Sequence, residues 1–230
     1  MLRPRQPALF FLALLAGGAG QRPRDHVELL FASDYFPNQI TGASGEIWYG
    51  LFPHGSTWEL ATTRIHVDPV TSGCIENGRR VTVDRSDHPL LLLRGLPSLR
   101  PGPIKTASVA HVRLMPGETR DFRMGDGTFR LVAKGGGPGQ EVRNYELRLV
   151  GRKAGFSQPI VAFHAREGMN GIAWPPEIIW IGDIDGDGKP DLFADLKMFE
   201  TPGKWALYLS SAAGVGELVE KVAEFAAVDC

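Results

Sequence analysis

The densest group of chemically active side chains in this sequence lies in one short stretch, residues 183–191. Asp183, Asp185, Asp187 and Asp191 stand at positions one, three, five and nine of this stretch. Alternate aspartates on a tightly curled loop direct their carboxylates at one centre, where they repel one another unless a cation neutralises them. Calcium takes roughly six to eight oxygen ligands, whereas magnesium prefers to keep several waters. The spacing therefore predicts a calcium site.

Other residues of the stretch fit this prediction. Gly186 and Gly188 tolerate positive φ and so allow the curl. Lys189, at position seven, offers only its backbone carbonyl as a ligand. An EF-hand fits less well, because it needs a bidentate glutamate at position twelve, where this chain has Ala194. Since one local loop supplies every ligand, we expect a closed, structural site; an Asp/Gly-rich turn without metal and a catalytic metal site are the alternatives.

The stretch Trp180–Phe193 resembles the DxDxDGxxD calcium loops of FG-GAP and VCBS-type repeats, which build integrin-like β-propellers and related extracellular modules. The resemblance covers about the last fifty-five residues, in one copy, whereas a propeller carries roughly 4–8 blades. This C-terminal part is also similar to the tails of uncharacterised exported bacterial proteins that share the loop. The resemblance implies one calcium-binding unit, with these ligands: the side chains of Asp183, Asp185, Asp187 and Asp191 and the carbonyl of Lys189.

Alternation of apolar and polar residues predicts half-buried β-strands along most of the chain. Strands are expected on both sides of the loop, at 177–181 and 191–196, with a hairpin partner at 205–209. The final segment, 218–226, fits both a helix and a strand, and a strand is favoured. Further strands are expected at 26–31, 58–67, 80–84, 111–114 and 144–150, with a hairpin formed by 119–124 and 128–132 around the turn Gly125-Asp126-Gly127.

These elements predict a mainly β fold, a compact antiparallel β domain or domains with a C-terminal calcium-loop hairpin unit. Residues 21–170 form the expected β-rich domain, and residues 171–230 the calcium-binding unit packed on the same fold. The proline-rich stretch 96–103 is expected to be an exposed connector.

Residues 1–20 have the pattern of a secretory signal peptide. Arg3 and Arg5 precede the apolar run 8–16, which is followed by small residues. This run is shorter than the roughly 20 residues that a membrane span needs. Cleavage after residue 20 would remove Arg3 and Arg5 and leave 23 basic against 26 acidic residues, a net charge of −3. The sequence therefore predicts a secreted or periplasmic protein without a membrane span after cleavage.

Both cysteines, Cys74 and Cys230, survive this cleavage. An even number of cysteines in an exported chain favours a disulfide, here Cys74–Cys230, with two free thiols as the alternative. Neither cysteine has a neighbouring histidine or a CxxC context, so neither is interpreted as a nucleophile.

The rest of the sequence gives weaker functional signals. The six histidines have no metal-binding spacing, and no basic patch with interleaved aromatics predicts nucleic-acid binding. We therefore expect an exported, non-catalytic calcium-binding protein with a binding or envelope role and an unknown partner, a protein or a carbohydrate. The alternative is a periplasmic or secreted hydrolase with an active site in the N-terminal β region. Two sets of residues are candidates for such a site. One is a carboxylate pair drawn from Asp34, Glu46 and Glu59; the other is an aromatic platform made by Trp48, Tyr49 and Trp58, for which core packing is the favoured interpretation.

Overall fold

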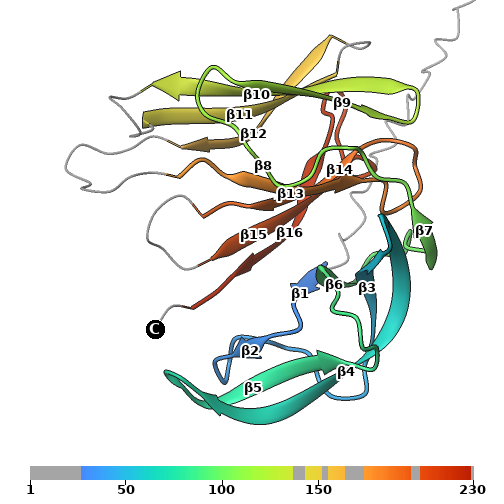
Figure 1. Cartoon of the computed structure of the whole chain (residues 1–230), viewed down its shortest axis with the longest axis vertical. Coiled ribbons are helices and arrows are strands. Elements are labelled where there is room, and N and C mark those ends of the chain that lie inside the picture. The colour runs from blue at the N-terminus through green and yellow to red at the C-terminus, as the bar shows by residue number, and fades with distance from the viewer. Residues whose placement is uncertain (1–26, 137–142, 152–154, 164–173, 198–202, 229–230) are drawn as a thin grey trace, which may run out of the picture.

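The computed structural model describes residues 27–136, 143–151, 155–163, 174–197 and 203–228 (Figure 1). The described part of the chain is all β, with 59% of its residues in strands and all sheets antiparallel. This confirms the predicted fold class. The expected signal peptide, the expected division at residues 170 and 171, and Cys230 lie outside the described residues. Within them, no helix is long and apolar enough to cross a membrane.

The strands form three sheets (Figure 1). The N-terminal sheet consists of β1 (Glu28–Leu30), β2 (Asp34–Tyr35), β3 (Ile47–His54), β4 (Thr57–Ser72), β5 (Ile75–Val83), β6 (Leu91–Arg94) and β7 (Gly102–Ile104). The β9–β12 sheet consists of β9 (Thr119–Met124), β10 (Gly127–Gly136), β11 (Arg143–Gly151) and β12 (Phe156–Phe163). The central sheet consists of β8 (Val112–Arg113), β13 (Glu177–Gly182), β14 (Asp191–Asp195), β15 (Lys204–Leu209) and β16 (Glu220–Ala226).

Three hairpins close through two-residue turns that begin with glycine. The turns are Gly55-Ser56, Gly73-Cys74 and Gly125-Asp126, and the glycines have φ of 60°, 56° and 54°. Positive φ at the first turn position matches the right-handed twist of the flanking strands, which is why glycine occupies it. The β9–β10 hairpin predicted from the sequence is thereby confirmed, and Cys74 lies at the tip of the β4–β5 hairpin.

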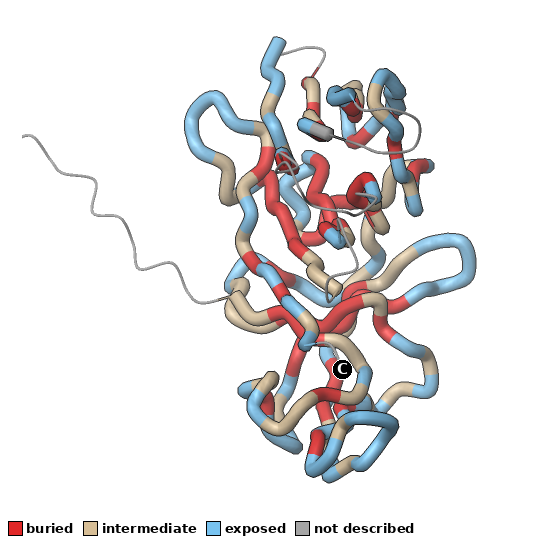
Figure 2. The backbone as a smooth tube through the Cα atoms, turned by 90° about the vertical axis from the view of Figure 1, so that its left-hand side faces the viewer, coloured by how far each residue is buried: buried red, intermediate tan, exposed pale blue. Residues whose placement is uncertain are grey.

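The central sheet is buried on both faces. Ile178, Leu192 and Tyr208 pack on one face, in the core shared with the β9–β12 sheet. Trp180 and Phe193 pack on the other face, in the core shared with the N-terminal sheet. Figure 2 shows the resulting pattern, with buried backbone in the interior and exposed segments at hairpin tips and outer loops. Because both faces of β13, β14 and β15 are covered, these three strands are nearly continuous apolar runs, whereas the edge strand β16 alternates between buried and exposed residues.

The final segment is the strand β16, which pairs with β15, so the strand favoured by the sequence is confirmed. Trp48 is 1% exposed and belongs to the core, and Trp58 and Tyr49 pack against that core. These three aromatics therefore form core packing rather than a surface platform. The expected exposed connector at 96–103 is wrong in one respect: Leu99 is fully buried, because the N-terminal core accepts it.

Burial on both faces makes the central sheet the most sensitive part of the fold to truncation. We expect Phe193→Ala to lower the free energy of unfolding by about 3–5 kcal/mol, since it leaves a cavity between two layers. Phe156→Ala is the matched control because Phe156, on β12, is 45% exposed; it should cost about 1 kcal/mol or less. Urea denaturation of both variants measures this, and equal costs would contradict the layered arrangement.

Candidate metal centre

The aspartate-rich stretch is the loop of the β13–β14 hairpin. Gly182 pairs with Asp191 at its base, and β14 pairs in turn with β15, so the strands predicted on both sides of the loop and their partner are confirmed. Gly186 and Gly188 have φ of 80° and 81°. These are the left-handed conformations that glycine adopts at little cost, as the curl requires.

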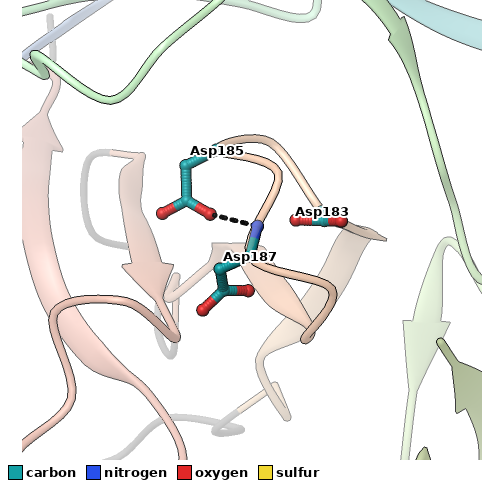
Figure 3. Close-up of side chains that lie close together, drawn as sticks. All are labelled: Asp183, Asp185 and Asp187. Carbon is teal, nitrogen blue, oxygen red and sulfur yellow. Dashed lines mark hydrogen bonds between the residues drawn. The ribbon is translucent and has the colours of Figure 1, made fainter. Parts of the chain in front are cut away.

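Three of the predicted ligands converge in this loop. Carboxylate oxygens of Asp183, Asp185 and Asp187 all lie within 4.8 Å of one another (Figure 3). Asp183 is buried, Asp185 is half-buried and Asp187 is exposed. The group therefore lies at the surface with its innermost carboxylate in the protein, an arrangement that can hold a metal ion.

Asp183 carries the clearest sign of a missing partner. Its Oδ2 accepts a hydrogen bond from the Gly188 backbone N–H at 3.1 Å. Its Oδ1 is buried and has no hydrogen-bond partner. A buried carboxylate oxygen without a partner costs free energy, and a cation among these three side chains removes that cost.

Backbone N–H groups of the loop are held by the same carboxylates. The N–H of Asp187 donates to Asp185 Oδ1 at 3.4 Å (Figure 3), and the N–H of Lys189 donates to Asp187 Oδ1 at 2.8 Å. Local bonds of this kind are typical of aspartate in turns. They leave acceptor capacity on each carboxylate, because an ionised carboxylate offers about four lone-pair sites.

Asp191 has a different place from the other three aspartates. Its carboxylate is fully buried, and its Oδ2 accepts from the Ile184 N–H at 2.8 Å. Its Oδ1 accepts from both the N–H and the hydroxyl of Ser210, at 2.8 and 3.0 Å. Asp191 therefore fastens the base of the loop to the end of β15. Its role as a direct ligand stays a prediction, as does that of the Lys189 carbonyl.

Two serines that the sequence reasoning missed complete the surroundings of the loop. The Ser210 hydroxyl lies 3.0 Å from both carboxylate oxygens of Asp187, and the Ser211 hydroxyl donates to Asp185. Both serines follow β15, whose pairing with β14 brings them beside the loop. The sequence shows two hydroxyl residues directly after the strand at 205–209. They can be assigned to the site only once it is known that β15 pairs with β14.

Burial, together with neighbouring negative charge, raises the pKa of two carboxyls in the loop. Burial raises the pKa of Asp191 to about 8, and the negative charge of Asp185 adds to the increase. Burial also raises the pKa of Asp185, with the charges of Asp187 and Asp183 adding to the effect and the Ser211 hydroxyl opposing it. A cation bound in the loop would favour the ionised form of these carboxyls and so oppose both increases in pKa.

All three sheets reach this loop. The Asp183 N–H donates to the Lys105 carbonyl in the segment that follows β7, at 2.9 Å. Ile184 is 1% exposed and belongs to the core shared with the N-terminal sheet. On the other side, a Cβ placed on Gly125, in the β9–β10 turn, would lie 2.6 Å from the Gly188 carbonyl oxygen. Only glycine fits this contact, so the turn packs directly on the loop.

The carboxylates considered for hydrolysis are each engaged by an arginine. Asp34 pairs with Arg80 at 2.7 Å, Glu46 with Arg94 at 2.6 Å, and Glu59 with Arg85 at 3.7 Å. These are pairings across neighbouring strands or loops of the N-terminal sheet. They account for the three carboxylates as members of separate ion pairs.

Two histidines pair with carboxylates in the same way. His66 bonds Asp84, and His111 Nδ1 lies 2.9 Å from Glu177 Oε1. His26 and His164 lie outside the described residues. Among the histidine, cysteine and acidic side chains of the described residues, those of Asp183, Asp185 and Asp187 are the ones whose geometry suits a metal ion.

Comparison with protein families, curated proteins and solved structures finds no match to this chain. The resemblance to FG-GAP and VCBS-type loops therefore rests on the loop motif alone, and the triad does not establish such a repeat.

The raised pKa values give the metal-free protein a characteristic pH dependence. The folded state binds a proton at Asp191 with a pKa of about 8, whereas an unfolded aspartate has a pKa of about 3.9. The folded state therefore holds more protons between about pH 4 and 8, and its stability falls as pH rises through this window. In chelator, we expect the free energy of unfolding to fall by at least about 1 kcal/mol from pH 5 to pH 8. Urea denaturation at several pH values measures this decrease. The variant Asp191→Asn should show a weaker dependence of stability on pH. A free energy of unfolding that rises with pH in both proteins would contradict the expectation.

Proposed function

We propose that the β13–β14 loop binds one calcium ion and that this ion has a structural role. The observation that carries the proposal is the buried, unpartnered Oδ1 of Asp183 beside the carboxylates of Asp185 and Asp187. An ion there interacts with an oxygen that no protein donor reaches and neutralises three mutually repelling charges.

Calcium suits this donor set better than softer or smaller cations. Every side-chain donor in the triad is a carboxylate oxygen, which favours a hard cation. The loop curls through two glycines and one side of it is exposed, so further oxygens from the backbone or water can complete an irregular coordination shell. Calcium accepts such a shell, whereas magnesium requires near-ideal octahedral geometry.

The role proposed for the ion is to hold the three sheets together. Its loop contacts the N-terminal core through Ile184, the segment after β7 through the Asp183 N–H, and the β9–β10 turn through Gly188. A ligand that binds only the folded state stabilises it by an amount that grows with the ratio of free ligand to dissociation constant. Calcium binding at this loop would therefore stabilise the contacts between layers.

We further propose that the protein is an exported, non-catalytic module with a binding or envelope role. The N-terminal pattern of residues 1–20 supports export, and the extracytoplasmic environment supplies calcium at levels that suit weak sites. A Cys74–Cys230 disulfide fits the same compartment. Supporting this pairing, Ile75 and Val228, which lie close in sequence to the two cysteines, line one common hollow.

A saturating concentration of calcium should raise the thermal midpoint of the mature protein. At about 100 times the dissociation constant, the gain is about 2.7 kcal/mol, or about 5–10 °C for a chain of this size. Asp185→Asn should lose this gain. In chelator, the same variant should unfold at or above the wild-type temperature, because it relieves like-charge repulsion and the burial of a charge.

Differential scanning fluorimetry with calcium, magnesium and chelator measures these effects. Asp68→Asn, an exposed aspartate on β4, is the matched control and should respond to calcium as the wild type does. A calcium response that survives in Asp185→Asn, or that magnesium reproduces in full, would contradict the proposed site.

The mature, oxidised protein should contain no free thiol. Peptide mapping without reductant should recover Cys74 and Cys230 in one linked peptide, and Cys74→Ser should destabilise the fold by up to about 4–5 kcal/mol in the chain-entropy model. Detection of two reactive thiols in the denatured, unreduced protein would exclude the bridge.

A further inference from the structure

An aromatic-walled hollow of about 340 Å³ opens between the N-terminal sheet and the central sheet. Its aromatic wall is formed by residues distant in sequence: Phe31, Tyr35 and Phe36 from the segment around β2, Trp205 from β15 and Phe225 from β16. This volume is within the range of about 300–1,000 Å³ that small-molecule sites occupy, and such sites occur preferentially between packed units.

Three of these rings keep accessible surface. Phe31, Phe36 and Trp205 are half-buried, while Tyr35 and Phe225 lie in the core behind them. Phe31 meets Trp205 edge to face, with ring centroids 5.0 Å apart, so neighbouring rings fix the orientation of the wall. Phe36, in contrast, belongs to neither core cluster described above, is half-buried and lines the hollow.

Polar groups share the same wall. Ser33 is exposed, and Asp34 holds Arg80 in a two-point pairing with bonds of 2.7 and 2.9 Å. Gln39 accepts from the Phe36 N–H at 3.2 Å and donates to the Ala226 carbonyl at 3.3 Å, which joins the two sides of the hollow. A ligand in the hollow thus meets aromatic rings together with hydroxyl and carboxylate groups.

A second hollow, of about 480 Å³, adjoins the first along residues 32–34. Its wall adds Thr82 and His88, which can donate or accept hydrogen bonds, and two arginines. Both arginines are already compensated, Arg80 by Asp34 and Arg85 by Asp87 at 2.7 Å. The hydrogen-bonding capacity of this region is therefore high while its charges are locally balanced.

We propose that this aromatic-walled hollow binds a neutral saccharide. The C–H face of a sugar ring is apolar and slightly positive, and it stacks on the negative face of an aromatic ring. Sugar hydroxyls both donate and accept, which matches Ser33, the Asp34–Arg80 pair and, in the adjoining hollow, Thr82. A charged ligand would compete with ion pairs that are already formed, and a purely apolar one would displace water from the exposed Ser33 hydroxyl without replacing its hydrogen bonds. The proposal goes beyond the calcium site and does not rest on it.

A glycan array of neutral and acidic oligosaccharides, probed with the mature protein, tests the proposal. Hits are then titrated by intrinsic tryptophan fluorescence, because Trp205 lies in the wall. We expect binding of neutral saccharides that weakens about tenfold or more in Phe36→Ala, which removes an aromatic face, and also weakens in Asp34→Asn. Phe156→Ala, which removes an exposed side chain at the start of β12, is the matched control and should bind as the wild type does. Thermal midpoints in calcium show that each variant is folded.

Three results would overturn the proposal. These are the absence of binding to any neutral saccharide at millimolar concentration, binding restricted to acidic glycans, and neutral binding that Phe36→Ala and Asp34→Asn leave unchanged. Because every titration is run with calcium and with chelator, a failure here is distinguishable from a failure of the calcium site, which the thermal midpoint reports separately.

Discussion

The architecture depends on the burial of both faces of the central sheet. Its strands carry large apolar side chains on each side, Trp180 and Phe193 toward the N-terminal sheet and Leu192 and Tyr208 toward the β9–β12 sheet. A sheet of this composition is stable only when another layer covers each face, since hydrophobic burial is the dominant favourable term in folding. The other two sheets therefore depend on the central one, which separates their cores and contributes to both.

The acidic loop lies where it contacts parts of all three sheets. Asp191 is fully buried at its base and Asp183 nearly so, although burial of carboxylates opposes folding unless they are compensated. Hydrogen bonds from Ile184 and Ser210 compensate Asp191, but Asp183 keeps one oxygen without a partner. A cation bound among Asp183, Asp185 and Asp187 would compensate this oxygen, and because the loop contacts all three sheets, it would stabilise their packing as well.

Many of the strands and the core of the metal centre could be predicted from residue patterns. The alternating stretches, the glycine turn at 125–126 and the strands on both sides of the loop follow from local preferences, and the structure has them. The convergence of Asp183, Asp185 and Asp187 was equally local, because nine consecutive residues with two glycines determine it.

Features that join distant segments could not be predicted in this way. Ser210 and Ser211 belong to the site only because β15 pairs with β14, and Gly125 contacts Gly188 only because the β9–β12 sheet packs beside the loop. The apolar residues at 191–195 and 204–209 indicate buried strands. That both faces of these strands are buried could be predicted only by knowing which sheets cover them. The aromatic-walled hollow likewise gathers residues from opposite ends of the chain.

Isothermal titration of calcium into chelator-treated mature protein is the most direct test of the central claim, with equilibrium dialysis to count the bound ion. We expect one calcium ion per chain in the wild type and none in Asp183→Asn, which replaces the buried carboxylate that carries the unpartnered Oδ1 with a neutral amide. Absence of bound calcium in the wild type, or undiminished binding in Asp183→Asn, would contradict it.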